Sequence, residues 1–410
     1  MGEAVRRPAR RSPSGRDAAL APSLATALAQ LLPGRDETAL LTTLLHRGES
    51  ARAAWQRFCA AVPDLPSAFR LDSGGWKRLS PLLLVALRES AVEADAALRT
   101  VLRTAYLREE LRSRAYREVA GVVLGALRDA GLRFLVLKGA ALSETVYGSP
   151  VLRHAHDVDL LVASADAGVA AEVMARAGLV AGRPLRDDQG RRFQHRSGLP
   201  FLLHRRLHRL SYYRADFDTL WARAAAARVA DVEVRVPGEA DQLLHALGHA
   251  ASSASRATLQ WVADAWMLLH AAGGVDWAEF PARVRESRLE LPVYTLLSYL
   301  GRELAAPVPG PALDGLGDLA ARARGGRRDV ALLGVRQRPV EAASPGPAAR
   351  DWRTRLTLLR WRTLPSPEYM RWRYGSSRSA AALPILYLER FVDYAGRRLA
   401  GVVRRCFATV

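Results

Sequence analysis

Residues 135–142 read LVLKGAAL, and residues 156–162 read HDVDLLV. Each segment contains a short apolar run of the kind that forms a buried β-strand. The first run ends at Lys138-Gly139, where a helical segment opens, and the second carries Asp157 and Asp159. Alternate residues of a strand point to the same face, so the two carboxylates project together. This layout predicts a polyphosphate site.

The expected chemistry of this site is phosphorus chemistry assisted by magnesium. Aligned carboxylates suit Mg²⁺, and sites with two metal ions drive in-line displacement at phosphorus, so one or two Mg²⁺ ions are expected on Asp157 and Asp159. A glycine ahead of a helix lets phosphate oxygens approach backbone N–H groups. The residues expected to hold a nucleoside triphosphate are Lys138, Gly139, Ala140 and Ser143.

Composition singles out Lys138 independently. Arginine supplies 58 of the 60 basic residues, and the two lysines are Lys77 and Lys138. Lysine and arginine are not interchangeable at tight sites. A lysine in an arginine-dominated chain therefore indicates a specific requirement at position 138.

These residues resemble a known family. Lys138-Gly139, Tyr147-Gly148, Arg153 and the Asp157-x-Asp159 pair are similar to the uncharacterised nucleotidyltransferase family of the DNA polymerase β-like superfamily. The resemblance implies a Gly-Ser or Gly-Gly turn, an acid pair on one strand and a third acid on a following strand. It implies catalytic roles for the acid pair and for Arg153, which would neutralise developing charge. Ala140 stands where the superfamily usually has serine.

The third acid is missing from its expected place. The matching stretch, PFLLHRRL at residues 200–207, has the expected histidine at His204 but puts Leu202 where the acid belongs. The third carboxylate would normally hold a metal ion or help to activate the attacking hydroxyl. The acids considered as spatial substitutes are Asp187, Asp188 and Glu233.

Two downstream helical segments, residues 241–251 and 259–270, also resemble the family. With His204, the resemblance assigns His249 and Asp264 to the substrate side. His245 and His249 have the i, i+4 spacing of a helical zinc pair, but Ala246 stands where the zincin motif requires glutamate. Helix packing or a substrate contact is therefore preferred to zinc.

Composition limits the remaining possibilities. A chain of 410 residues that is 49% hydrophobic is long enough for more than one core. The two cysteines indicate no disulfide scaffold, and no uncharged apolar run reaches the length of a membrane span. Without a signal-type apolar segment, the expected location is cytoplasmic.

The net charge of +19 could indicate nucleic acid, an anionic membrane surface or polyphosphate substrates. The arginines are spread through the chain, which favours solvated surfaces. A basic aromatic stretch at residues 352–374 could stack bases or lie on a membrane. A C-terminal helical cap, with tryptophans packed on the body, is preferred.

The expected fold is α+β, with a small mixed-sheet core between helical regions. Strands are expected at 133–138, 157–163, 191–196, 200–204 and 229–236, helices at 92–130, 140–147 and 165–178, and a loop at 179–190. Ser197-Gly198 predicts a hairpin turn. The expected regions are a disordered basic arm (1–17), N-terminal helices (18–130), the nucleotidyltransferase-like core (131–237), a helical domain (238–336), a linker (337–350) and the C-terminal cap (351–410).

Three functions fit these residues. The first is Mg²⁺-dependent transfer of a nucleoside monophosphate, with ATP as the expected donor, to an unidentified small molecule or protein. The second is a binding module that lost the chemistry, with Leu202 as its signature, and that holds a nucleotide, a protein or a nucleic acid. The third, kinase-like phosphoryl transfer, uses the same residues. The sequence does not indicate an oligomeric state.

Overall fold

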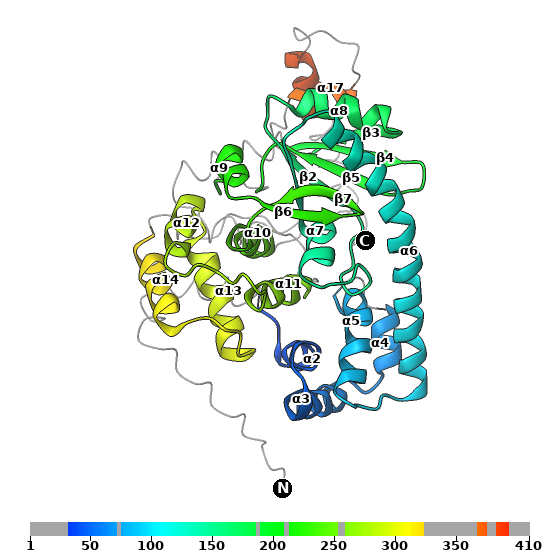
Figure 1. Ribbon diagram of the computed structural model, residues 1–410, viewed down its shortest axis with the longest axis vertical. Coiled ribbons are helices and arrows are strands. Elements are labelled where there is room, and N and C mark those ends of the chain that lie inside the picture. Colours follow the sequence, from blue (N-terminus) through cyan, green and yellow to red (C-terminus); the bar gives the residue numbers. More distant parts are fainter. Residues whose placement is uncertain are drawn as a thin grey trace, which may run out of the picture.

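The computed structural model describes residues 32–71, 75–185, 189–208, 213–252, 259–323, 367–374 and 383–392. A seven-stranded sheet forms the upper part of the view in Figure 1, and most of the helices that precede and follow it in the sequence lie below and beside it. The helices before the sheet are α2 (Arg35–Leu45), α3 (Gly48–Ala61), α4 (Leu65–Leu71), α5 (Trp76–Glu89) and α6 (Ala96–Asp129). The expected class, a mixed-sheet α+β core flanked by helices, is confirmed.

The sheet is mixed, and the strands that carry the motif residues lie at its centre. The strands are β1 (Phe134–Leu137), β2 (Val158–Val162), β3 (Leu179–Pro184), β4 (Gly190–His195), β5 (Pro200–His204), β6 (Ala225–Val229) and β7 (Val232–Val236). Their order is β3-β4-β5-β2-β1-β7-β6. Strand β2 is antiparallel to β1 and parallel to β5. The turn predicted at Ser197-Gly198 joins β4 and β5 as an antiparallel pair.

The two faces of the sheet have different partners. One face buries Val136, Leu160 and Phe201 against α6 and α8 (Ala167–Arg176). The other face buries Leu135 and Leu161 in a smaller cluster that includes a residue of α9 (Phe217–Ala222). Alternation along β2 places Asp159 on the second face, away from α6.

A second core is built from helices far apart in the sequence. Helices α2 to α5 share it with the helices that follow the sheet. Those helices are α10 (Glu239–Ser252), α11 (Gln260–Leu269), α12 (Phe280–Ser287), α13 (Glu290–Glu303) and α14 (Gly310–Arg322). Leu98 and Leu102 of α6 belong to this core, whereas Val123 and Leu127 belong to the core under the sheet. Helix α6 therefore joins the two cores along one flank of the molecule (Figure 1).

The limits of α6 follow from its sequence. Asp95 caps the first turn by accepting a hydrogen bond from the Leu98 N–H at 3.0 Å. Gly131 adopts a positive φ of 68° after the last turn, as expected for the glycine that ends a helix. The predicted helix end at Gly131 is confirmed.

The expectation of a loop at residues 179–190 is wrong for its first half, which forms the edge strand β3. The polar, glycine-containing sequence is compatible with an edge strand because one side of the strand stays in water. Val180 is 71% exposed there, while Leu179 and Pro184 are buried. Pairing with β4, which sequence periodicity does not reveal, supplies the missing hydrogen bonds.

The single strand expected at 229–236 is also wrong, because the chain reverses between β6 and β7. Ala230 and Asp231 form the turn with φ values of 48° and 63°, a conformation that usually selects glycine or asparagine. Tertiary contacts hold it in place. Arg117 of α6 pairs with Asp231 at 3.1 Å, and the Ala230 N–H donates to Glu144 of α7 (Lys138–Thr145) at 3.0 Å.

Helix α17 (Pro367–Tyr374), in the region expected as the C-terminal cap, lies against β3, but its Trp372 is 45% exposed and is not packed on the body as expected. Glu368 accepts hydrogen bonds from Arg191 at 2.9 Å and from Arg205 at 2.7 Å. A further helical segment covers residues 383–392. The expected basic arm and linker lie outside the described residues. Within the described part of the chain, no helix combines the length and apolar character needed to span a membrane.

Candidate functional site

The junction between β1 and α7 sets the position of Lys138. Helix α7 begins at Lys138 itself, two residues earlier than expected, with a left-handed φ of 50°. That conformation costs a non-glycine residue about 1–2 kcal/mol. Leu137 is the register partner of Asp159, so the turn carries the lysine ammonium over β2. Lys138 Nζ lies 3.0 Å from Asp159 Oδ1.

Asp159 has a second partner from β5. His204 Nε2 lies 2.5 Å from the same Oδ1, and the two residues are only 4% and 3% exposed. Burial would raise the pKa of Asp159, but Lys138 and His204 outweigh it and hold the pKa well below its usual range. Burial lowers the pKa of His204. A neutral His204 therefore donates from Nε2, and its buried Nδ1 has no hydrogen-bond partner within the described residues.

Asp157 is in a different state from Asp159. It lies just ahead of β2 with its side chain 23% exposed, and His156 Nε2 is 3.3 Å from its Oδ2. Burial, followed by the negative charge of Asp159, raises the pKa of Asp157 to about 7, although Lys138 and Arg153 oppose the shift. The two carboxylates therefore share one face but differ in charge near neutral pH.

Leu202 occupies the position beside this pair. It is the register partner of Asp159 on β5, and Arg192 of β4 is its partner on the other side. Register partners share a face, so the apolar side chain lies where a third carboxylate would complete the site. Helix and strand geometry thus puts Leu202, rather than an acid, next to Asp159.

The acids considered as substitutes for a third carboxylate do not fill this position. Residues 187 and 188 lie outside the described part of the chain. Glu233 is on β7, where Arg235 is the partner of Leu135, so Glu233 lies level with residue 133. Asp159 lies level with Leu137, four residues or about 13 Å farther along the strands. Glu233 is therefore at the other end of the sheet.

Arg153 is fixed by a buried acid of the helical core. Its Nε and Nη2 donate to the two carboxylate oxygens of Asp264 at 3.1 and 2.7 Å, and Nη1 donates to the His154 carbonyl at 2.9 Å. The Tyr147 hydroxyl also donates to Asp264, at 2.8 Å. Burial opposes the charge of Arg153, but Asp264 more than offsets this and raises its pKa. Asp264, expected on the substrate side, contacts Arg153 and Tyr147 in the structure.

Gly139 is required by Arg153. A Cβ at Gly139 would lie 2.1 Å from Arg153 Nη1 and 2.9 Å from the Ala155 Cβ. The guanidinium group therefore lies directly against the first turn of α7, which contains Ala140. Ser143, expected to contact the nucleotide, is buried and donates its hydroxyl hydrogen to the Ala140 carbonyl at 3.2 Å. Its side chain is thus turned into its own helix.

The histidines of α10 lie near the acid pair, but the described residues do not form a metal centre with them. His249 is exposed on α10, and its pKa is lowered by its crowded surroundings and then by Lys138, with Asp159 opposing. The rings of His245 and His249 are 6.3 Å apart, and those of His208 and His245 are 6.0 Å apart. Across the described ranges, no three His, Cys, Asp or Glu side chains are arranged to hold a metal ion.

Two supporting groups were missed by sequence reasoning. Glu109 of α6 lies 3.0 Å from His154 Nδ1, and Arg112 donates to the Ala155 carbonyl at 2.9 Å, which anchors the loop before Asp157. Glu109 follows the buried Leu102 by seven residues, or about two helical turns, so both lie on the same side of α6. An acid at a buried helical position is a signal that could have identified Glu109 from the sequence. His208 was also missed, although it follows His204 by four residues in an otherwise arginine-rich run.

The donor set fits one divalent cation. Both hydrogen bonds to Asp159 from Lys138 and His204 go to Oδ1, so Oδ2 remains available beside the partly exposed Asp157. Burial raises the pKa of Asp157 and the charge of Asp159 adds to the shift, so a cation between the two carboxylates would relieve their repulsion. Leu202 removes the ligand that a second ion would need.

We predict that Asp157→Asn stabilises the protein at high pH. At low pH the carboxyl is protonated in both the folded and the unfolded chain. Between its ordinary pKa and about 7 only the unfolded chain ionises fully, so stability falls as pH rises through this window and the deficit persists above it. Urea unfolding with a chelator present should show a gain of about 1–3 kcal/mol at high pH and almost none near pH 4.

Asp159→Asn is the matched comparison, because folding lowers rather than raises the pKa of Asp159. The carboxylate of Asp159 therefore stabilises the folded protein above the ordinary pKa of aspartate. This stabilisation is lost as the pH falls below that value. The asparagine variant should be less stable than wild type at high pH. An Asp157→Asn gain that is the same at every pH would contradict the assignment.

We predict that Gly139→Ala destabilises the protein by about 2–4 kcal/mol, since the methyl group would displace Arg153 and leave Asp264 buried without its cation. Thermal unfolding measures the change. Gly168→Ala in α8 is the control, because nothing lies within 4 Å of a Cβ there. Equal behaviour of the two variants would show that Arg153 does not need this glycine.

Comparison with known proteins assigns this chain to a family. The model of the uncharacterised nucleotidyltransferase family matches residues 73–304, more than half of the chain. No curated protein matches significantly. The solution structure of the antibiotic-resistance factor ANT(2″)-Ia matches with 13% identity and a TM-score of 0.34, over 46% of this chain and 97% of that one, a likeness too distant to support an argument. By its family match, the chain belongs to the uncharacterised nucleotidyltransferase family.

Proposed function

We propose that the protein transfers a nucleoside monophosphate from a nucleoside triphosphate, with ATP as the expected donor, to a hydroxyl or phosphate of a small molecule or protein. One observation carries this proposal. Asp159 on the central strand and Asp157 just ahead of it form an acid pair beside the lysine that opens α7. Family membership supports the same class of reaction.

The residues that would hold Mg²⁺ are Asp157 and, through its second oxygen, Asp159. When bound, the ion would neutralise phosphate charge and polarise the bond to phosphorus. Asp159 is already ionised in the folded protein because Lys138 and His204 stabilise its charge. The nearly neutral His204 contributes a fixed hydrogen bond that keeps the carboxylate oriented.

Lys138 and Arg153 have different parts in binding the triphosphate. The side chain of Lys138 is 26% exposed and its ammonium group is joined to Asp159 by one contact, so it can turn to a phosphate. Arg153 is 12% exposed and engaged through all three nitrogens, so it remains in place and supplies a fixed positive charge beside the first turn of α7. We therefore expect Lys138 to change partner when the nucleotide binds, and Arg153 to stay.

Leu202 supports a second candidate function, a nucleotide-binding module that has lost turnover. The family resemblance requires a carboxylate at this position, and the register puts the leucine directly beside Asp159. The two functions differ in their products. Nucleotidyl transfer releases pyrophosphate, kinase-like transfer releases a nucleoside diphosphate, and a binding module releases neither.

Calorimetry with ATP is expected to show binding that needs Mg²⁺ and that Asp157→Ala/Asp159→Ala abolishes, because these acids would hold the ion that neutralises the phosphate charge. Asp129→Ala/Asp218→Ala is the control, since it removes the same charge from side chains that are 68% and 71% exposed elsewhere. Binding of equal strength in both double variants would exclude the acid pair as the nucleotide site.

Leu202→Asp is expected to strengthen Mg²⁺ binding by roughly tenfold, because it adds a third carboxylate beside Asp159. Without the metal it should lower the free energy of unfolding through like-charge repulsion. Leu202→Asn has the shape of the aspartate without its charge, so it should not strengthen Mg²⁺ binding and should lower the free energy of unfolding less than Leu202→Asp does. Pyrophosphate release gained only by Leu202→Asp would favour the binding module as the native function, whereas unchanged Mg²⁺ affinity would show that position 202 does not face the site.

A further inference from the structure

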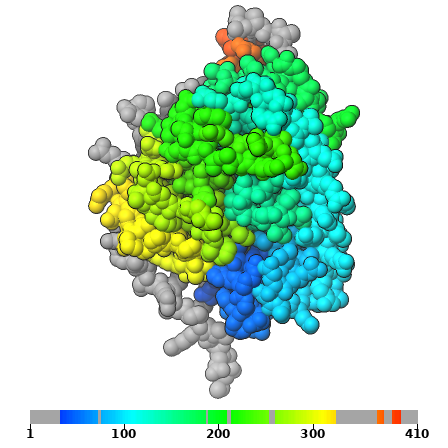
Figure 2. Space-filling view, in the orientation of Figure 1, coloured from blue at the N-terminus to red at the C-terminus, as the bar shows by residue number. Residues whose placement is uncertain are grey.

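The outer side of α6 is unusually apolar for an exposed helix. Leu107, Leu111 and Val122 are 48%, 66% and 63% exposed. At 100° per residue these three side chains lie within about 60° of one another on the helix surface. The helix runs along one flank of the molecule, and the space-filling view shows it at the surface (Figures 1 and 2). This stripe has no partner among the described elements.

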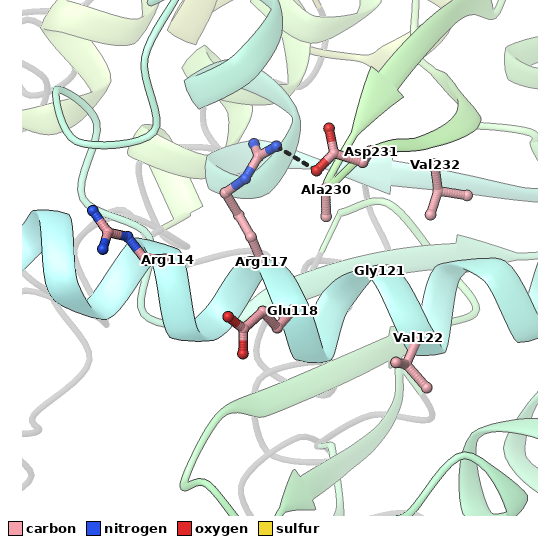
Figure 3. Close-up of a pocket in the computed structure, with 8 residues that line it drawn as sticks. All are labelled: Arg114, Arg117, Glu118, Gly121, Val122, Ala230, Asp231 and Val232. Atoms are coloured by element: carbon pink, nitrogen blue, oxygen red, sulfur yellow. Dashed lines mark hydrogen bonds and ion pairs between the residues drawn. The ribbon is translucent and has the colours of Figure 1, made fainter.

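The two halves of the stripe have opposite shapes. The first half projects Leu107 and Leu111, whereas the second half contains Gly121 and Gly125 on the same side of the helix. A Cβ at Gly125 would have nothing within 4 Å, whereas a Cβ at Gly121 would lie 3.0 Å from the Ala230 carbonyl oxygen of the β6–β7 turn. Gly121 and Val122 line a cavity of about 430 Å³ between α6 and the β6–β7 turn (Figure 3). The helix thus offers large side chains at one end and space at the other.

One basic and one acidic side chain, neither in an ion pair with the described residues, lie between the two halves of the stripe. Arg114 and Glu118 are both exposed, and they line the same cavity. The two side chains do not meet in Figure 3, and the described residues provide neither with an ion-pair partner. An arginine and a glutamate four residues apart on an apolar stripe are suited to partners outside the chain.

This surface of α6 is complementary to the same surface on a second copy of the chain. Each of the pairs 114 and 118, 111 and 121, and 107 and 125 is equidistant from Tyr116. An antiparallel copy of α6, related by a two-fold axis at Tyr116, therefore places leucines over glycines and opposite charges together at both ends. A side chain packs into the space between residues i, i+3, i+4 and i+7 of a facing helix. For Leu111 that space lies between residues 118, 121, 122 and 125 of the other copy.

We propose that this face of α6 is a homodimer interface, in which Leu111 enters the depression beside the partner subunit's Gly121 and Arg114 pairs with the partner subunit's Glu118. A second copy is favoured over another protein because one surface supplies both members of the leucine–glycine and arginine–glutamate contacts, as a closed two-fold interface requires. The open site at Gly125 allows close approach of the two helices. The net charge of +19 per chain opposes association, so the dimer should tighten as salt rises toward physiological strength.

Sedimentation equilibrium of the full chain, from low to high micromolar concentration at physiological salt, tests this interface. Wild type is expected to form a concentration-dependent dimer. Gly125→Leu should abolish the dimer by filling the space that Leu107 needs. It should not unfold the chain, because the site is open and leucine favours helix over glycine. Val180→Arg, at an equally exposed apolar position on β3, should dimerise like wild type.

A charge exchange tests the arrangement itself. Arg114→Glu and Glu118→Arg should each weaken dimerisation by roughly tenfold, and the double variant should restore it, because every pair regains opposite charges. A wild type that remains monomeric throughout, a dimer unaffected by Gly125→Leu, or a double variant weaker than either single variant would overturn the proposal.

Discussion

The buried carboxylate of Asp159 is the charge on which this structure depends. A buried carboxylate is tolerated only when cations and hydrogen-bond donors compensate it. Lys138 reaches it from the end of β1, and His204 reaches it from β5. The charge of Asp159 is therefore compensated only if β1, β2 and β5 keep their register and Lys138 keeps its left-handed backbone. The cost of that backbone conformation is offset by the ion pair it makes possible.

The other half of the site depends on the helical core rather than on the sheet. Asp264 of α11 holds Arg153, and Arg153 in turn lies against Gly139 at the start of α7. Helix α6 connects the two halves, since Glu109 and Arg112 anchor the loop that leads into Asp157. The position of the guanidinium group relative to the acid pair is thus set by how the two cores pack together. A change at their interface would alter the site without altering its residues.

Periodicity was enough to locate the elements that build the centre of the site. The apolar runs ending at Leu137 and containing Asp159, the hairpin at Ser197-Gly198 and the end of α6 at Gly131 all follow from local rules. The edge strand β3 and the turn at Ala230-Asp231 do not, because pairing partners and contacts from α6 and α7 determine them. The local sequence at 230–231 even disfavours the turn that forms. Contacts made at a distance in the chain therefore account for the wrong expectations.

The candidate site likewise has residues that the sequence identifies and residues whose roles depend on distant contacts. The sequence brought out Lys138, Asp157, Asp159 and His204 as one group, and the structure places Lys138 and His204 on the same oxygen of Asp159. It assigned phosphate approach to Gly139 and a substrate contact to Asp264, whereas both residues position Arg153. Those roles depend on the meeting of α7 with α11, which no spacing within either segment reveals.

The central claim is that Lys138 exchanges Asp159 for a phosphate when the nucleotide binds. With only two lysines in the chain, labelling lysine Cε with ¹³C gives two NMR signals, and the exposed Lys77 on α5 serves as an internal reference. Titration with Mg²⁺ and a non-hydrolysable ATP analogue should shift the Lys138 signal and leave Lys77 unchanged. A Lys138 signal that stays in place while calorimetry reports saturation would contradict the account, because the nucleotide would then bind without the lysine at the start of α7.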